Sequence, residues 1–593
     1  MAEIAVSPRI IFAGSSAISS RAYKNIFSAS MSINALQFDR FRAKLWIDHA
    51  NWLMRRFPTV ALQLFRTKSP DHLIAEAAAP ERQMKRTLTA FDLTCIGIGA
   101  VIGTGIFALI GTAIAGQTFP TRLETPVLNF IQAWLSGADV VLGRAGAGPA
   151  VAISLLVAAL ACGFAALCYA ELASMIPVSG SAYTYSYATL GEIVAWIIGW
   201  DLILEYAVGN MAVAVGWSGY FVKLCGSLFG LKFPLWAVTD YRTAGDLIKN
   251  GSDALKDFSS TTLPVIAGHP IALNLPALLI VAVVTSLLIY GIRESAKTNT
   301  WIVITKVAVV IFFISFGAFM VHPTNWHPYV PNGFAGVMSG AAIIFFAFIG
   351  FDAVSTTAEE TKNPRRDMPI GIIASLIICT LLYVLMGTVL TGIKRYSVYL
   401  GDPAAAATAF ASQPWAEALV SAGALAGMTS VLLVFQLGQP RIFMAMARDG
   451  LLPQYFAKIH PRFRTPYVTT IWTGVVVGGV AMLADIGSLS DLTNIGTLFA
   501  FILVCVGVAV LRRTDAGRPR PFRVPLVPLF PIVGVIFCFV LMLSLPILTW
   551  MRFVVWLVIG LVIYFLYSVR HSKLRRGLDT RITEDIPPPL IKT

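Results

Sequence analysis

The chain carries a succession of apolar runs, each about 20 residues long, separated by shorter polar segments. A helical run of this length matches the hydrocarbon thickness of a bilayer, so each run predicts one membrane-spanning helix. We place helices near residues 91–116, 150–173, 190–226, 273–292, 297–321, 334–357, 369–393, 415–438, 466–486, 490–511, 526–547 and 550–569. The pattern therefore predicts an all-α polytopic membrane protein with one twelve-helix transmembrane domain over residues 91–569.

The third run, residues 190–226, is longer than a bilayer requires, so it is either one steeply tilted helix or two shorter spans. Lys and Arg concentrate in cytoplasmic loops, and this bias decides between the two. With twelve spans and both termini in the cytoplasm, most of the 45 Lys and Arg fall on the cytoplasmic side. Two spans would put the basic loops 441–464 and 512–523 outside. We therefore expect one helix here, in a protein of the cytoplasmic (inner) membrane.

Two segments flank the predicted transmembrane domain. Residues 1–60 have no clear signal-peptide pattern. We interpret residues 1–90 as a basic cytoplasmic region whose amphipathic stretch near 41–65 can lie on the membrane surface. An equally open alternative is that translation begins at Met54 and that residues 1–53 are a mis-assigned start. Residues 570–593 are expected to form a short cytoplasmic tail.

Composition excludes several other classes of protein. The 593 residues are 56% hydrophobic and 13% charged, with a mean hydropathy of +0.73, whereas soluble chains carry about 25% charged residues. The net charge of +14 lies at span ends and in the N-terminal region, not in a basic stripe, so we expect no nucleic-acid partner. The seven cysteines are scattered with neither metal-site nor disulfide spacing. No metal and no other cofactor is predicted.

The first predicted span holds four glycines in nine residues, within the segment GIGAVIGTGIF at 97–107. Each glycine weakens a helix by about 1 kcal/mol relative to alanine. Either Gly99 and Gly103 let a neighbouring helix pack closely, or Gly103-Thr104-Gly105 marks a break. At a break, the N–H groups that open the second half attract a carboxylate, and freed carbonyls accept from an ammonium group. A broken span therefore suits the zwitterionic end of an amino acid.

A second glycine-interrupted span runs from Phe345 to Asp352 around Gly350, five helices later. An inverted repeat would place a partner span there, and interrupted spans at matching positions of two halves indicate a transporter binding site. The chain contains no G-x-x-x-x-G-K-[ST] loop, so we do not expect it to drive transport with ATP.

Two charged residues lie inside predicted spans, where a charge is costly unless it faces a partner or water. Lys306 either exchanges a proton during a transport cycle or is a permanent charge bonded to helix-end carbonyls. Glu205 either pairs with a cation or satisfies hydroxyl and amide groups of a neighbouring helix. Asp201 lies one turn earlier and extends the same polar strip.

From about residue 66 to residue 570 the chain resembles the amino acid–polyamine–organocation superfamily, specifically the cationic amino acid transporter branch and its bacterial relatives. The resemblance rests on these segments: RTKSP (66–70), KRTL (85–88), GIGAVIGTGIF (97–107), YAEL (169–172), PVSGSAY (177–183), IGFD (349–352) and QPRIFMAMARDGLLP (439–453). It implies a LeuT-like fold, which is a five-plus-five inverted repeat followed by two extra C-terminal helices.

The resemblance also implies a binding site between the broken first and sixth helices. By motif position, the substrate carboxylate is held by Val101, Thr104 and Gly105. The amine is held by Phe346, Ala347 and Ile349, which also close over the side chain, with Gly209 of the third helix nearby. Lys306 matches the fifth-helix lysine that occupies the space of a sodium ion in proton-coupled relatives, and Glu205 matches the third-helix glutamate.

The chain departs from this pattern in three places. Residues 117–148 are longer than we expect between the first two spans, and residues 1–60 have no recognisable counterpart. Gln436 lies in the eighth span where side-chain selectivity is set, and it is polar where bacterial relatives are often apolar. It therefore predicts a polar or cationic substrate side chain, unless it faces a neighbouring helix.

Together these features predict a secondary transporter that moves L-amino acids across the cytoplasmic membrane by proton symport and alternating access. Two alternatives stay open: an exchanger without net proton flux, and a sensor that binds amino acids without transporting them. An enzyme is not expected, since no nucleophile–base constellation appears in the spans. The expected partners are an amino acid, protons and the lipid bilayer. The sequence leaves the oligomeric state and the amino acids carried open.

Overall fold

The computed structural model describes residues 64–77, 86–117, 121–249, 255, 258–266, 268–290, 296–463 and 465–576. The possible mis-assigned start, nearly all of the predicted amphipathic stretch and most of the C-terminal tail lie outside the described residues. The chain divides into two compact units, Met1–Leu64 and Phe65–Thr593, and all that follows concerns the second.

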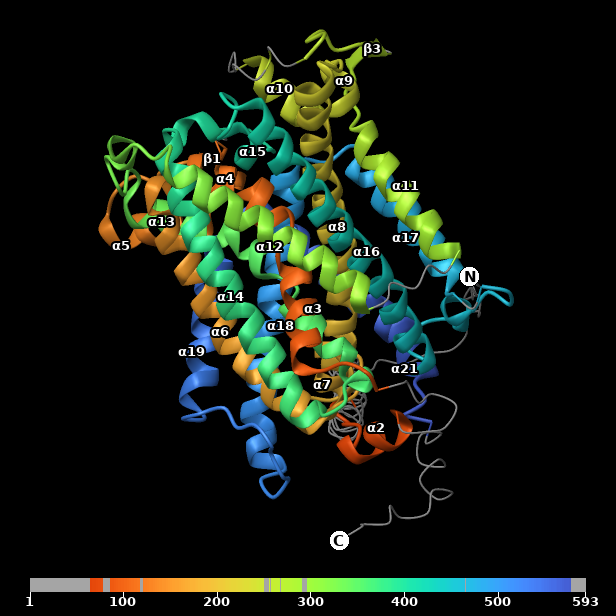
Figure 1. Ribbon diagram of the computed structural model, residues 1–593. Coiled ribbons are helices and arrows are strands. Elements are labelled where there is room, and N and C mark those ends of the chain that lie inside the picture. The colour runs from red at the N-terminus through yellow and green to blue at the C-terminus, as the bar shows by residue number, and fades with distance from the viewer. Residues whose placement is uncertain are drawn as a thin grey trace, which may run out of the picture. The chain divides into compact units, whose positions relative to one another are not determined.

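Long apolar helices make up most of this unit (Figure 1). Among the described residues, eight segments are long and apolar enough to cross a membrane: Gly148–Met175, Glu192–Phe229, Thr300–Ala318, Gly333–Glu360, Pro364–Ile393, Pro414–Arg448, Ile486–Thr514 and Ile547–His571. A ninth span is the bent pair of Ala90–Val101 and Gly105–Ala115. The prediction of a polytopic, all-helical membrane protein is therefore confirmed.

The principal helices have the following bounds: α3 (Ala90–Val101), α4 (Ile110–Ala115), α6 (Val151–Met175), α8 (Glu192–Phe229), α11 (Leu275–Tyr290), α12 (Ala296–Ala318), α13 (Gly333–Ile344), α14 (Pro364–Ile393), α16 (Pro414–Arg448), α17 (Tyr467–Ala481), α18 (Ile486–Thr514), α19 (Leu529–Leu543) and α20 (Ile547–Ile563). Three of them, α11, α17 and α19, are only 15 or 16 residues long and lie where three further spans are predicted.

The third predicted span is one uninterrupted helix of 38 residues, α8, as the charge bias indicates. It is the most enclosed of the long helices, with 94% of its most apolar window buried, against 22% for the last span. It packs along α16 and α18. Because α8 is enclosed on all sides, the polar groups on it must find partners on other helices.

Short elements gather at the two ends of the helix bundle (Figure 1). At one end, which we call the insert face, lie the described residues of two inserts: the first covers 117 and 121–148, and the second covers 230–249, 255, 258–266 and 268–274. They contain β1 (Gly116–Gln117), η2 (Arg122–Glu124), α5 (Val127–Ser136), β2 (Arg144–Ala145), α9 (Leu235–Val238), α10 (Tyr241–Lys249), β3 (Val265–Ile266) and β4 (His269–Pro270). β1 pairs antiparallel with β2, and β3 with β4. A small apolar core of Leu235, Ala244, Leu247 and Ala272 holds the second insert together.

At the opposite end, which we call the terminal face, lie α2 (Pro70–Ala77), α7 (Ser181–Thr189), α21 (Val569–His571) and residues up to Arg576. A buried carboxylate, Glu192, begins α8 here. It accepts from the Tyr564 hydroxyl at 3.0 Å, from the Arg575 Nε at 3.0 Å and from the Ser572 hydroxyl. These contacts join the last described residues to α8. The negative charge of Glu192 is itself favoured at the first turn of the helix.

Candidate functional site

The first break lies where the glycines predict it. α3 ends at Val101, and Ile102 has an extended backbone (φ −73°, ψ 101°). The chain resumes at Gly105 with a π-helical turn, η1 (Gly105–Leu109), before α4, and the two halves are bent by 41°. The break therefore frees carbonyl groups at the end of α3 inside the bundle, and each needs a donor.

The second break has the same character. α13 gives way at Ile344 to a 3₁₀ turn, η6 (Phe345–Phe348), and then to Ile349 in an extended conformation. Gly350 has φ +120°, which side chains rarely adopt, and the span continues as a second 3₁₀ helix, η7 (Phe351–Glu360). Only glycine adopts such a backbone without strain, so the interruption is determined by this residue.

The two breaks touch each other through their backbones. A Cβ added to Gly105 would lie 2.2 Å from the Cα of Ala347, and one added to Gly350 would lie 2.9 Å from the carbonyl oxygen of Ala100. Thr104, in the first break, is buried with its methyl group toward Gly216 of α8, and its hydroxyl has no hydrogen-bond partner among the described residues. The predicted carboxylate and amine ends of the site are therefore adjacent, with one polar group unsatisfied.

Side chains from other helices take up the carbonyls that the breaks expose. Lys306 of α12 is buried and donates from Nζ to the carbonyl oxygens of Gly99 at 2.7 Å and Ile102 at 3.2 Å. The hydroxyl of Tyr383, on α14, donates to the Val101 carbonyl at 2.8 Å. At the second break, Asn494 of α18 donates to the Ala342 carbonyl at 2.7 Å. Each broken helix end is thus held by a polar side chain from a continuous helix.

The remaining predicted site residues fall into two groups. Val101, Phe346, Ala347 and Ile349 are buried at the breaks. Gly209 of α8 faces α16 and α18 instead, since a Cβ there would lie 3.0 Å from the Phe435 ring and 3.5 Å from Thr493.

Gln436 is engaged away from the breaks. Its side-chain oxygen accepts from the Asn210 amide of α8, and its Nε2 donates to the Thr285 hydroxyl of α11 at 3.1 Å. Its polar atoms therefore face neighbouring helices, which is the second of the two interpretations that the sequence allowed.

The acidic strip on α8 is buried as well. Glu205 lies beside the Thr497 hydroxyl of α18 and near Asp352. Asp201 packs against Gly496, and neither of its carboxylate oxygens has a hydrogen-bond partner in the described part of the chain. No group of three His, Cys, Asp or Glu side chains among the described residues could hold a metal ion.

Tyr383 and Asn494 are the residues at the breaks that sequence reasoning missed. The signal was present, because a polar side chain inside an apolar run is expensive without a partner, but their helices offered no second feature to single them out.

The comparisons with known proteins agree with this architecture. A family model for amino acid permeases matches residues 88–567, which include both breaks and all of the described spans except the last four residues of the final one. The chain belongs to the amino acid permease family. As a member of this family, within the amino acid–polyamine–organocation superfamily, it is a multi-pass membrane transporter rather than an enzyme.

Individual relatives carry different substrate names. The permease is 46% identical to the branched-chain amino acid permease BcaP of Bacillus subtilis and 43% identical to the methylthioribose transporter of the same organism; each match covers 86% of this chain and 99% of the relative. It is 35% identical to the vacuolar cationic amino acid transporter 4 of Arabidopsis thaliana, with coverage of 78% and 67%. The family is therefore shown, while the relatives' names differ in the substrate.

Proposed function

We propose that this permease moves L-amino acids with apolar side chains across the cytoplasmic membrane by proton symport and alternating access. The observation that carries the proposal is the contact between two broken spans whose exposed carbonyls are held by Lys306, Tyr383 and Asn494. Paired broken helices are the arrangement that secondary transporters use to bind the charged ends of a substrate.

In this proposal the substrate carboxylate binds where the first span resumes, at Val101, Thr104 and Gly105, because free N–H groups and the unsatisfied Thr104 hydroxyl lie there. The ammonium group binds at Phe346, Ala347 and Ile349. The residues at the two breaks are largely apolar, which favours an apolar substrate side chain. The engaged amide of Gln436 removes the main argument for a cationic one.

Proton coupling is assigned to Lys306 and Glu205. Lys306 binds the carbonyls at the first break, so loss of its proton would weaken the contact that holds the end of α3, because a neutral amine is a weaker donor than an ammonium group. The same contacts fit a permanently charged structural lysine, which is what an exchanger without proton flux would have. Glu205 of α8 is buried near two other carboxylates, Asp352 of η7 and Asp201 of α8, a setting in which a carboxyl group can carry a proton.

The fold that accompanies this function is the LeuT-like five-plus-five repeat with two added helices. It requires α11, α17 and α19 to count as spans, giving twelve. It also places the terminal face in the cytoplasm and the insert face outside. This assignment holds whether the protein is a monomer or an oligomer.

The experiment is uptake into proteoliposomes with and without an inward proton gradient, using labelled leucine, isoleucine, valine, alanine, arginine, lysine and methylthioribose. Symport predicts accumulation of the apolar amino acids only with the gradient. Flux that requires amino acid preloaded inside would make the protein an exchanger, and binding without any flux would make it a sensor. Accumulation of arginine or methylthioribose alone would overturn the substrate assignment.

Two matched variants test the proton role of Lys306. Lys306→Ala and Tyr383→Phe each remove side-chain hydrogen bonds to carbonyls at the end of α3. Burial favours the neutral form of both side chains, which means proton release for a lysine but proton retention for a tyrosine. If Lys306 carries the proton, its variant loses the pH dependence of uptake while Tyr383→Phe keeps it. If both variants slow uptake and leave the pH profile unchanged, Lys306 is a structural strut.

A further inference from the structure

The insert face contains an ion pair that is almost entirely buried. The Nη1 atom of Arg144 donates to both carboxylate oxygens of Asp491, at 2.7 and 2.6 Å, and the two side chains are 2% and 5% exposed. The Nε and Nη2 atoms of Arg144 have no partner among the described residues. A buried ion pair is no more stabilising than well-packed apolar side chains, so stability alone does not account for it.

Arg144 is connected to the halves of the two broken spans that reach the insert face, α4 and α13. It lies in β2, which pairs with β1 directly after α4, so that Gln117 and Arg144 are opposite one another. Two residues beyond it, the carbonyl of Gly146 accepts from the Asn332 amide at 2.7 Å, at the start of α13. The guanidinium group therefore moves with α4 and α13.

Asp491 belongs to α18, which packs against α13 beside the second break. Asn494, which binds the Ala342 carbonyl, follows Asp491 by three residues. At 1.5 Å per residue, the two positions are about 4.5 Å apart along the helix axis. The ion pair therefore lies about one helical turn closer to the insert face than the contact between Asn494 and Ala342.

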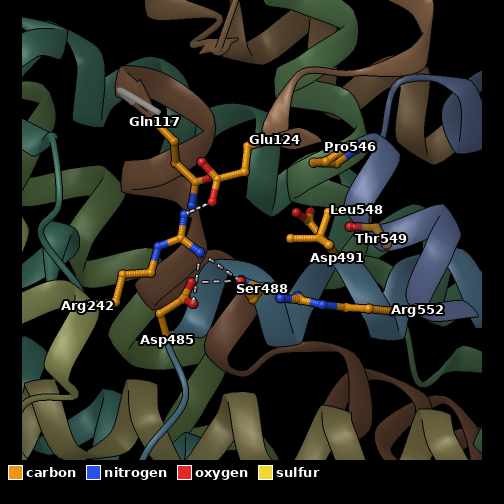
Figure 2. A pocket seen from close by; sticks show the side chains of 10 residues that line it. All are labelled: Gln117, Glu124, Arg242, Asp485, Ser488, Asp491, Pro546, Leu548, Thr549 and Arg552. Carbon is orange, nitrogen blue, oxygen red and sulfur yellow. Dashed lines mark hydrogen bonds and ion pairs between the residues drawn. The ribbon is translucent and has the colours of Figure 1, made fainter. Parts of the chain in front are cut away.

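A pocket at the insert face reaches Asp491 (Figure 2). Its wall comes from the first insert, α10, and the beginnings of α18 and α20, and it carries both signs of charge: Glu124, Arg242, Asp485, Asp491 and Arg552. Arg242 bridges the rim, pairing with Glu124 and, at 3.7 Å, with Asp485. These rim side chains are 15–30% exposed, so their pairing is weak compared with that of the buried pair.

We propose that the Arg144–Asp491 pair is a latch that closes the substrate site toward the insert face. When it is formed, it holds α4 and α13 against α18 between the pocket and the breaks. The pocket has a volume of about 20 Å³, room for about one water molecule, so a zwitterionic solute passes toward the breaks only when the pair opens and the pocket widens. This inference rests on the proposed function, because it takes the breaks as the substrate site and the insert face as the outside.

The test measures access to the breaks from outside. A cysteine in place of the buried Thr104, in a Cys225→Ser background, reports access to a membrane-impermeant thiol reagent added to intact cells. The other native cysteines within the described residues are buried. Asp491→Asn removes the ion pair, and we expect the labelling rate to rise at least tenfold.

Glu171→Gln is the matched control. Glu171 is also buried and bound by two nitrogens of an arginine, Arg512, but at the opposite end of α18. Because distant sites act independently, Glu171→Gln should leave the rate of labelling from outside within about twofold of the parent rate. An equal rise in both variants would mean general loosening and would overturn the latch, as would an unchanged rate in Asp491→Asn.

Exchanging the charges of Arg144 and Asp491 tests whether a change in labelling rate comes from loss of the pair or from misfolding of the variant. The double variant Arg144→Asp/Asp491→Arg should return the labelling rate to that of the parent if the pair itself is what closes the site. A fast rate in the double variant, with an elution profile like the parent's on size exclusion, contradicts the proposal. Labelled amino-acid uptake by cells that carry the same Asp491 variants but keep Thr104 separates the two hypotheses: uptake with unchanged labelling refutes only the latch, and a labelling shift without uptake refutes only the transport assignment.

Discussion

Replacing Gly105 by alanine tests the contact between the two broken spans. The added Cβ would lie 2.2 Å from the Cα of Ala347. Carbon atoms at rest are about 3.5 Å apart or more, so one half-helix must move by roughly 1.3 Å. Because the atom it meets is backbone, rotation of a side chain cannot relieve the clash.

The cost of such overpacking is about 1–3 kcal/mol, which corresponds to a roughly 5- to 150-fold loss in affinity. If the breaks form the substrate site, this loss appears in transport. We expect the KM for the amino acid in proteoliposome uptake to rise by a factor in that range, or the rate to fall below detection. The melting temperature of the purified protein should fall as well, by an amount that corresponds to no more than this cost of about 1–3 kcal/mol.

Gly163→Ala provides the comparison. Gly163 also lies in a membrane helix, α6, but nothing approaches an added Cβ within 4 Å. That substitution should be neutral or stabilise the helix by up to about 1 kcal/mol. Wild-type KM and rate in Gly105→Ala would show that the breaks can separate without affecting transport, and the site would have to be sought elsewhere.

Three further predictions concern the polar groups around the site and the insert face. Asn494→Ala leaves the Ala342 carbonyl without its donor and should destabilise the protein by about 1–3 kcal/mol, seen as a lower melting temperature; an unchanged value would show that another group or water replaces it. Gln436→Leu removes the partner of Asn210 and Thr285 and should lower stability while leaving the order of preferred substrates unchanged; a changed order would return Gln436 to the selectivity site. Burial raises the pKa of Asp240, so the folded protein binds this proton more tightly than the unfolded chain, and stability falls as pH rises from about 4 through the raised pKa. Asp240→Asn should therefore flatten the melting temperature against pH, and parallel curves for the two proteins would contradict the assignment.

The sequence predicted the elements whose cause is local. The breaks follow from Gly103, Gly105 and Gly350, since glycine alone determines where a helix is weak or a positive φ is allowed. The continuous α8 followed from the placement of Lys and Arg in the loops. These features need no knowledge of which helices are neighbours.

Partners distant in the chain could not be predicted. Lys306 binds carbonyls more than 200 positions away, and Arg144 lies 347 positions from Asp491. Choosing between the two interpretations of Gln436 required the rotation of α16 about its axis. That rotation is set by close packing of small residues rather than by a hydrophobic face, since buried and lipid-facing surfaces are both apolar.

The buried carboxylate of Glu192 has a consequence for the order in which the protein is made. Its Arg575 partner is synthesised 383 residues later, which at about 5–20 residues per second is a delay of roughly 20–80 s on the ribosome. Until then the start of α8 cannot settle into its final environment, because an unpaired carboxylate is too costly to bury. The start of α8 is therefore completed only after residues near the end of the chain have been synthesised. A chain stopped before Ser572 would lack the Ser572 and Arg575 partners of Glu192 and would leave the start of α8 without its final environment.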